Sequence, residues 1–80
     1  MKLPIVITMG EPSGIASEIA IKSWINRKKF KLPNFFLLDD YKKIEFINKK
    51  FKLNANLKKI DSPNQVSKTF NTSLPILDMK

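Results

Sequence analysis

Two side chains that often carry chemistry are missing from this chain of 80 residues, which contains no cysteine and no histidine. Without cysteine, the chain forms no disulfide and offers no thiolate to a metal. Without histidine, it lacks both an imidazole ligand for zinc and the usual general base near neutral pH. Catalysis by these residues alone would depend on Asp, Glu, Lys, Ser, Thr or Tyr.

Arginine is almost absent, although the formal net charge is +8. Arg27 is the only arginine among the 15 cationic residues, and the lysines are scattered from Lys2 to Lys80. Base readout and bidentate phosphate contacts favour arginine over lysine. We therefore expect a solvated, lysine-rich surface and no sequence-specific binding to nucleic acid.

Long apolar runs are also missing, since no stretch approaches the roughly 18–20 residues of a membrane span. Glu11 interrupts the N-terminal apolar segment, and no signal-peptide cleavage pattern follows it. We expect a cytoplasmic protein without a membrane partner. No repeat or internal linker divides residues 1–80, which we interpret as a single unit belonging to a larger α/β domain.

Short apolar runs alternate with helical periodicity along the chain. Residues 5–8 and 35–38 are typical of buried parallel strands, and residues 57–60 and 74–77 are further strand candidates. Helical spacing predicts two apolar stripes, one formed by Ile15, Ile19, Trp24 and Ile25, and the other by Tyr41, Ile44, Ile47 and Phe51. The order β-α-β-α-β predicts an α/β fold with a parallel sheet.

Several details of this fold follow from local signals. Ser13 or Ser17 is a candidate cap for the first helix, and Asp39 or Asp40 for the second, with a ribose contact as the alternative for the two aspartates. Residues from Ser62 onward predict an irregular stretch before the last strand. Two helices cannot cover both faces of such a sheet. We therefore expect an incomplete fold in which the strand at 35–38 lacks partners on one face.

The two glycines of the chain both lie in "ITMGEPSGIASEIAIKSW", residues 7–24, between the first strand and the first helix. Their spacing fits neither the Walker A loop nor the dinucleotide fingerprint G-x-G-x-x-G, and Glu11 would repel a bound phosphate. We take Thr8, Gly10, Glu11 and Gly14 as the candidate binding residues. The Glu11 carboxylate either faces hydroxyls, water or a neighbouring loop, or braces the loop structurally.

This stretch resembles the N-terminal motif of the 4-hydroxythreonine-4-phosphate dehydrogenase family of pyridoxal-phosphate biosynthesis. In that motif a strand is followed by Thr-x-Gly-Asp-Pro-Ala-Gly-Ile-Gly-Pro-Glu. The matching positions are Thr8, Gly10, Pro12, Gly14, Ile15 and Glu18. The chain departs from the motif at Glu11, Ser13, Ala16 and Ser17. A weaker similarity in layout extends to the C-terminus.

The resemblance implies the N-terminal portion of an isocitrate/isopropylmalate-dehydrogenase-like fold, with an active site at a homodimer cleft. It implies oxidation and decarboxylation of a phosphorylated substrate, 4-phosphooxy-L-threonine, with NAD or NADP and a divalent metal as cofactors. The family holds its metal with histidines, so this chain carries no metal ligand or catalytic residue of the family, and we expect it to be inactive alone. Two alternatives stay open. One is a stand-alone module that binds an anionic ligand or partner through the loop at 10–14 and the lysine-rich surface. The other is a subunit completed by a separate polypeptide.

Overall fold

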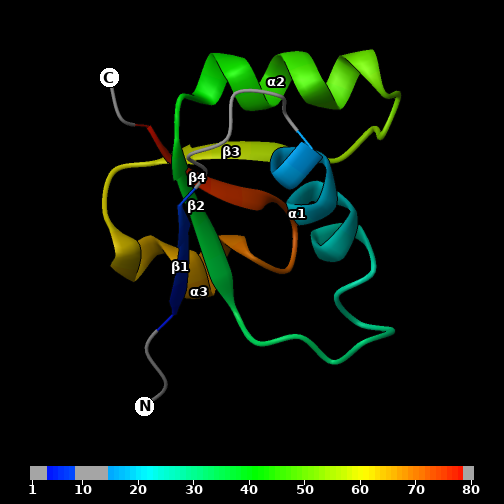
Figure 1. Cartoon of the computed structure of the whole chain (residues 1–80). Coiled ribbons are helices and arrows are strands. Elements are labelled where there is room, and N and C mark those ends of the chain that lie inside the picture. Colours follow the sequence, from blue (N-terminus) through cyan, green and yellow to red (C-terminus); the bar gives the residue numbers. More distant parts are fainter. Residues whose placement is uncertain (1–3, 9–14, 79–80) are drawn as a thin grey trace.

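The computed structural model describes residues 4–8 and 15–78. These residues form a small α/β unit whose strands and helices alternate as the sequence predicts (Figure 1). The elements are β1 (Ile5–Thr8), α1 (Ile15–Ile25), β2 (Phe35–Asp39), α2 (Tyr41–Lys50), β3 (Leu57–Ile60), the 3-10 turn η1 (Pro63–Gln65), α3 (Val66–Thr69) and β4 (Leu74–Asp78).

All four strands run parallel in one sheet of order β1-β2-β4-β3. The last strand, β4, is therefore inserted between β2 and β3, and β3 pairs with β4 alone among the described strands. Among the described strands β1 occupies one edge and pairs with β2 alone, from Ile5 opposite Phe35 to Thr8 opposite Leu38. The parallel sheet confirms the predicted fold class.

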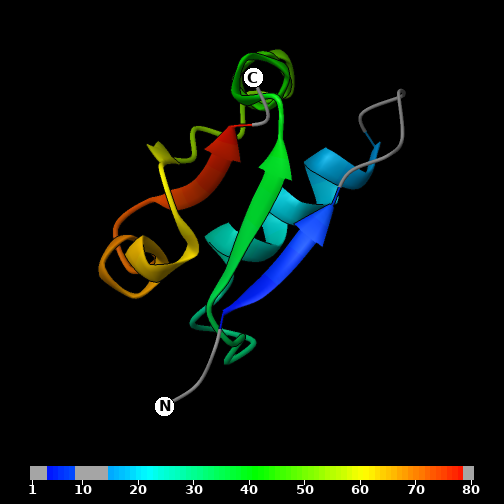
Figure 2. The same ribbon diagram turned by 90° about the vertical axis from the view of Figure 1, so that its left-hand side faces the viewer.

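Right-handed crossovers explain where the helices lie. The connections from β1 to β2 and from β2 to β3 advance in one direction across the sheet, which places α1 and α2 on the same face. The connection from β3 back to β4 runs in the opposite direction and places α3 on the other face. Figure 2 views the sheet from the α3 side and shows β1 and β2 with no described helix in front of them.

The core lies between the sheet and its helices, and β2 runs through its centre. Phe35 and Phe36 are each only 5% exposed, and Leu37 is fully buried. The expectation that this strand lacks partners on one face is wrong, because Phe36, whose side chain alternates to the face opposite Phe35, is buried as well. Phe70, directly after α3, packs edge-on against Phe35 with ring centroids 5.0 Å apart. The prediction that residues 5–8 form a buried strand is wrong, because β1 lies at the edge of the sheet with Ile5 51% and Val6 48% exposed.

Helix α1 exists as predicted, but it buries a different face. Its buried residues are Ser17, Ala20, Ile21 and Trp24, whereas Ile15, Ile19 and Ile25 of the predicted stripe are exposed. Apolar side chains surround this helix, so their spacing does not select a face. Ser17 does not cap the helix, because its hydroxyl is buried without a hydrogen-bond partner. Ser13, the other predicted cap, lies outside the described residues.

Helix α2 follows its predicted stripe more closely. Ile44 and Ile47 are buried and Tyr41 is half-buried, while Phe51 at the C-terminal end is 42% exposed. Asp40 is the N-cap, and its side chain accepts a hydrogen bond from the backbone N–H of Lys42 at 3.0 Å. One of the two predicted caps is therefore confirmed.

Both helical segments end in the same hydrogen-bond arrangement. After α2, Lys52 N–H donates to Lys49 O at 3.1 Å and Leu53 N–H to Asn48 O at 3.0 Å. The turns after α1 end likewise, with bonds from Lys31 N–H to Lys28 O (3.3 Å) and from Leu32 N–H to Arg27 O (2.9 Å). This pattern is the Schellman motif, which requires a left-handed residue. Here lysines supply it, Lys31 at φ 52° and Lys52 at φ 53°.

The stretch after Ser62 is more regular than predicted, since η1 and α3 occupy residues 63–69. Its end is fixed to the end of α1. Trp24 Nε1 donates to Phe70 O at 2.8 Å, and the Arg27 guanidinium lies 3.9 Å from the centre of the Trp24 ring. Arg27 also donates to Trp24 O and Asn71 O. In the described part of the chain, no helix is long and apolar enough to cross a membrane.

Candidate functional site

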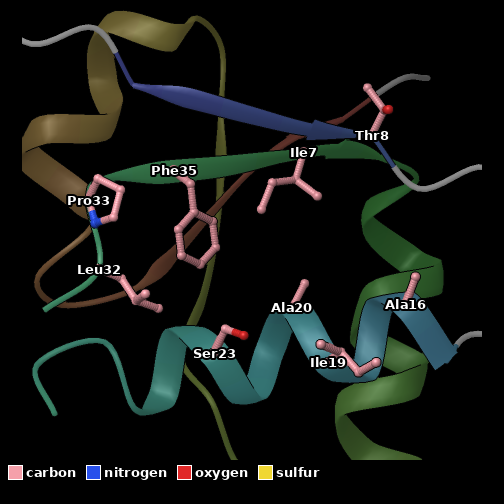
Figure 3. Close-up of a pocket in the computed structure, with 9 residues that line it drawn as sticks. All are labelled: Ile7, Thr8, Ala16, Ile19, Ala20, Ser23, Leu32, Pro33 and Phe35. Atoms are coloured by element: carbon pink, nitrogen blue, oxygen red, sulfur yellow. The ribbon is translucent and has the colours of Figure 1, made fainter. Parts of the chain in front are cut away.

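An open hollow lies between the β1–β2 edge of the sheet and helix α1 (Figure 3). Its volume is about 490 Å³. Ile7 and Phe35 point from the strands toward the helix, where Ala20 faces them, and Leu32 and Pro33 close the end nearest the start of β2. The remaining lining residues are Thr8, Ala16, Ile19 and Ser23.

The lining of this hollow is apolar and uncharged. None of its nine residues is ionisable, although charged residues make up 28% of the chain. The hydroxyls of Thr8 and Ser23 are its only side-chain polar groups. Such a surface accommodates an apolar group, but it supplies neither a general acid nor a general base.

One of the four predicted binding residues can be placed. Thr8 is the last residue of β1, is exposed, and lies on the rim of the hollow. Gly10, Glu11 and Gly14 lie outside the described residues. The strand that leads into this segment and the helix that follows it are both present, so the predicted strand–loop–helix order is confirmed on its two sides.

A second group of polar side chains stands at the carboxyl ends of the central strands. Asp39 ends β2 and Asp78 ends β4, and the two residues are register partners in the parallel sheet. Ligands of open α/β sheets bind outside this edge. The sequence reasoning singled out Asp39 but missed Asp78. Both strands end in Leu-Asp, which is the signal that could have found it.

The two carboxylates hold the start of α2. Asp39 accepts the Asp40 N–H at 2.6 Å and pairs with Lys43 Nζ at 3.2 Å. Asp78 accepts the Tyr41 N–H at 3.2 Å and pairs with Lys59 Nζ at 3.4 Å. Carboxylates near the first N–H groups of a helix satisfy donors and complement its dipole. This arrangement anchors α2 to the sheet and gives Asp39 a structural role, whereas the alternative ribose contact stays a prediction.

A further hollow of about 370 Å³ lies between α2 and the segment before β3, and its lining is polar. Asn48 uses its side-chain amide there to donate to Ala55 O at 2.9 Å and to accept from Ala55 N–H at 3.1 Å. The side chain therefore ties α2 to the chain that enters β3. Among residues 4–8 and 15–78, no group of three or more His, Cys, Asp or Glu is placed to hold a metal ion.

Comparison with known proteins finds several relatives named 4-hydroxythreonine-4-phosphate dehydrogenase. The chain is 30% identical over 76 residues to the 4-hydroxythreonine-4-phosphate dehydrogenase of Zymomonas mobilis, which covers 95% of the chain and 21% of that protein. It is 46% identical over 37 residues to the protein of the same name from Bradyrhizobium diazoefficiens, covering 46% of the chain and 11% of the relative. The Methylorubrum extorquens protein of this name is 30% identical over 76 residues, 95% of the chain and 22% of the relative.

The chain thus spans about a fifth of the length of the relatives that match it over 76 residues. It matches no model of a known protein family. No solved structure matches it either. These similarities support a partial match to the family that the loop motif indicates.

Proposed function

We propose that this chain is the N-terminal portion of a 4-hydroxythreonine-4-phosphate dehydrogenase with an isocitrate/isopropylmalate-dehydrogenase-like fold. The observation that carries the proposal is the similarity to proteins of this name over 95% of the chain. The parallel α/β order is consistent with it, because β1 ends directly before residues 9–14 and α1 begins directly after them, as the resemblance requires.

In this proposal the chain supplies scaffold, and the reacting groups lie elsewhere in the enzyme. A divalent metal does not fit the described residues, because no three candidate ligands lie together and the sequence contains no histidine. NAD or NADP does not fit the carboxyl edge of the sheet, where Asp39 and Asp78 oppose a pyrophosphate and are engaged by α2. We assign both cofactors, the substrate-phosphate contacts and the homodimer cleft to the complete enzyme.

Activity assays test this proposal in two steps. The purified chain, supplied with NAD or NADP, a divalent metal and 4-phosphooxy-L-threonine, is expected to show no metal-dependent reduction of the nicotinamide. A chimera in which this chain replaces the matched portion of the Zymomonas mobilis protein is expected to show that reduction.

The control for the chimera is the same protein with residues 1–80 in scrambled order. Activity of the isolated chain would contradict the assignment of the reacting groups. A folded chimera without activity would contradict the family assignment itself.

A further inference from the structure

The pentapeptide Lys-Lys-Phe-Lys-Leu occurs twice in the chain, at residues 28–32 and 49–53. Each copy ends a helical segment in the Schellman motif described above, with its last lysine in the left-handed conformation. The closing leucines, Leu32 and Leu53, pack against the core. The same sequence therefore forms the same structure twice, and each time its leucine contacts the core while its other four residues stay exposed.

Each copy leaves its phenylalanine in solvent beside a lysine. Phe30 is 59% and Phe51 42% exposed. Lys29 Nζ lies 5.7 Å from the centre of the Phe30 ring, and Lys50 Nζ lies 5.5 Å from the centre of the Phe51 ring, both within cation–π distance. Phe46 is 63% exposed, and its ring centre lies 6.0 Å from the same Lys50 Nζ. Exposed apolar groups rimmed by polar ones are typical of interaction surfaces.

The two copies lie at the same edge of the sheet. A helix that connects two parallel strands runs back along the sheet and ends near the start of the next strand. Residues 28–31 precede the start of β2, and residues 49–52 precede the start of β3. Figure 1 shows α1 and α2 ending on the same side of the molecule, at the right. We call residues 28–31 and 49–52 together the basic–aromatic surface.

The lysines of the basic–aromatic surface have no acidic neighbours in the sequence, because no aspartate or glutamate occurs in residues 19–38 or 46–60. Within the described part of the chain, the lysines that form ion pairs are Lys22, Lys43 and Lys59, all outside this surface. The three lysines of each copy therefore keep an uncompensated positive charge. A partner that carries negative charge complements it.

We propose that the basic–aromatic surface docks an acidic segment of another polypeptide, whose apolar side chains cover Phe30 and Phe51. Carboxylates of that segment pair with the lysines, and its apolar side chains remove the two phenylalanine rings from water. This docking goes beyond the proposed function and does not depend on it, because it uses only residues of this chain at the edge opposite Asp39 and Asp78.

Nucleic acid fits this surface less well than an acidic polypeptide. Bidentate phosphate contacts favour arginine, and the only arginine, Arg27, donates to two backbone carbonyls. Stacking of bases uses the faces of aromatic rings, whereas a lysine already lies over the phenylalanine ring of each copy. A second copy of the chain is also disfavoured, because each carries a formal charge of +8 and the two repel one another.

Fluorescence anisotropy with a labelled peptide of repeated Glu-Glu-Glu-Leu tests the proposal on the chain of 80 residues. An extended peptide of roughly 12 residues spans the 35 Å longest dimension of the molecule and so reaches both copies. It is expected to bind more tightly than a Glu-Glu-Glu-Ser peptide of the same length and than an oligothymidylate of the same charge. Vesicles of phosphatidylserine and phosphatidylcholine are expected not to displace it.

The first copy is tested by a matched pair of variants. Phe30→Ser and Ile19→Ser both remove an apolar side chain that is 59% exposed, but only Phe30 belongs to the basic–aromatic surface. Phe30→Ser is expected to weaken binding of the glutamate–leucine peptide about fivefold, as truncation of an interface anchor does. Ile19→Ser is expected to leave the affinity unchanged.

The second copy is tested by removal of charge. The double variant Lys49→Gln/Lys50→Gln is expected to weaken binding more than Lys58→Gln/Lys68→Gln, which removes the same charge from exposed lysines outside the surface. All these variants change exposed side chains, so their circular dichroism is expected to match that of the parent chain. If Phe30→Ser fails to fold, the lysine variants still decide the question.

Several results would overturn the proposal. One is the absence of binding by the glutamate–leucine peptide. Another is equal or tighter binding of the serine peptide, which would reduce the interaction to charge alone. Tighter binding of the oligothymidylate would identify nucleic acid as the partner, and displacement by the vesicles would identify a membrane surface. Equal affinities within either pair of variants would place the peptide elsewhere on the chain.

Discussion

At the scale of single residues, lysine occupies two left-handed positions at helix ends where glycine is the usual residue. Lys52 occupies the left-handed position of the Schellman motif after α2 at φ 53°, and Lys31 does so after α1 at φ 52°. Glycine is the usual residue there, because a side chain crowds the following carbonyl in this conformation. Each lysine therefore stores backbone strain at a helix end.

Lys52→Gly is expected to raise the free energy of unfolding by about 0.5–1 kcal/mol, because relief of the left-handed strain exceeds the entropy that glycine adds to the unfolded chain. Urea unfolding followed by circular dichroism measures the change. The matched control is Lys49→Gly, in the last turn of α2, which is expected to lower the free energy of unfolding by a similar amount. A loss of stability in Lys52→Gly would show that the lysine side chain contributes more than the strain costs.

At the scale of elements, the sequence predicts which segments are helices and strands better than it predicts which faces they bury. The runs at 5–8 and 35–38 become β1 and β2 because β-branched and aromatic residues suit strands, but only β2 is buried as predicted. In α2 the lysines leave one apolar face, and Ile44 and Ile47 are buried as expected. In α1 large apolar residues surround the helix, and packing selects the face with the small residues Ser17 and Ala20. The spacing of apolar residues in the sequence therefore does not predict which face of α1 is buried.

The candidate site shows the same limit. The sequence predicts Thr8 as a candidate binding residue because it ends the first strand, and the structure places it on the rim of the hollow. The hollow is lined by residues of β1, α1, β2 and the turn before β2. Because these segments are separated in the sequence, no local sequence pattern predicts the hollow. Asp78 meets α2 only because β4 is inserted beside β2, an order that the alternation of strands and helices leaves open.

The connection between α1 and the segment after α3 depends on Arg27. Its guanidinium stacks on Trp24 and donates to the carbonyl oxygens of Trp24 and Asn71. Lysine cannot reproduce this planar, forked arrangement. Arg27→Lys is expected to lower the free energy of unfolding by about 1–2 kcal/mol, from one lost hydrogen bond and the lost stacking.

Urea unfolding monitored by the fluorescence of Trp24, the only tryptophan, measures this loss. Lys28→Arg, on an exposed neighbour, serves as the control and is expected to leave the midpoint unchanged. Equal midpoints for Arg27→Lys and the parent chain would mean that the contact is energetically neutral.

At the scale of the whole molecule, protection of the backbone should decrease from the centre of the sheet toward β1. β2 and β4 pair on both sides and are buried, whereas β1 is an exposed edge of four residues. In the isolated chain we expect the amides of Leu37 and Ile76 to exchange most slowly and those of Val6 and Thr8 most rapidly. Hydrogen exchange followed by NMR at low protein concentration measures this order. Uniformly rapid exchange would show that the 80 residues do not maintain the sheet alone.

The position of β4 also governs when this sheet can form during synthesis on a ribosome. β3 has no described partner except β4, so from the time residue 60 leaves the exit tunnel until residue 78 follows, β3 and one edge of β2 are unpaired. At about 5–20 residues per second, this interval is on the order of one to four seconds. Two strand edges then stay unpaired until the last strand emerges, and because unpaired edges promote aggregation, we expect chaperones that bind during this interval to improve the yield of folded chain.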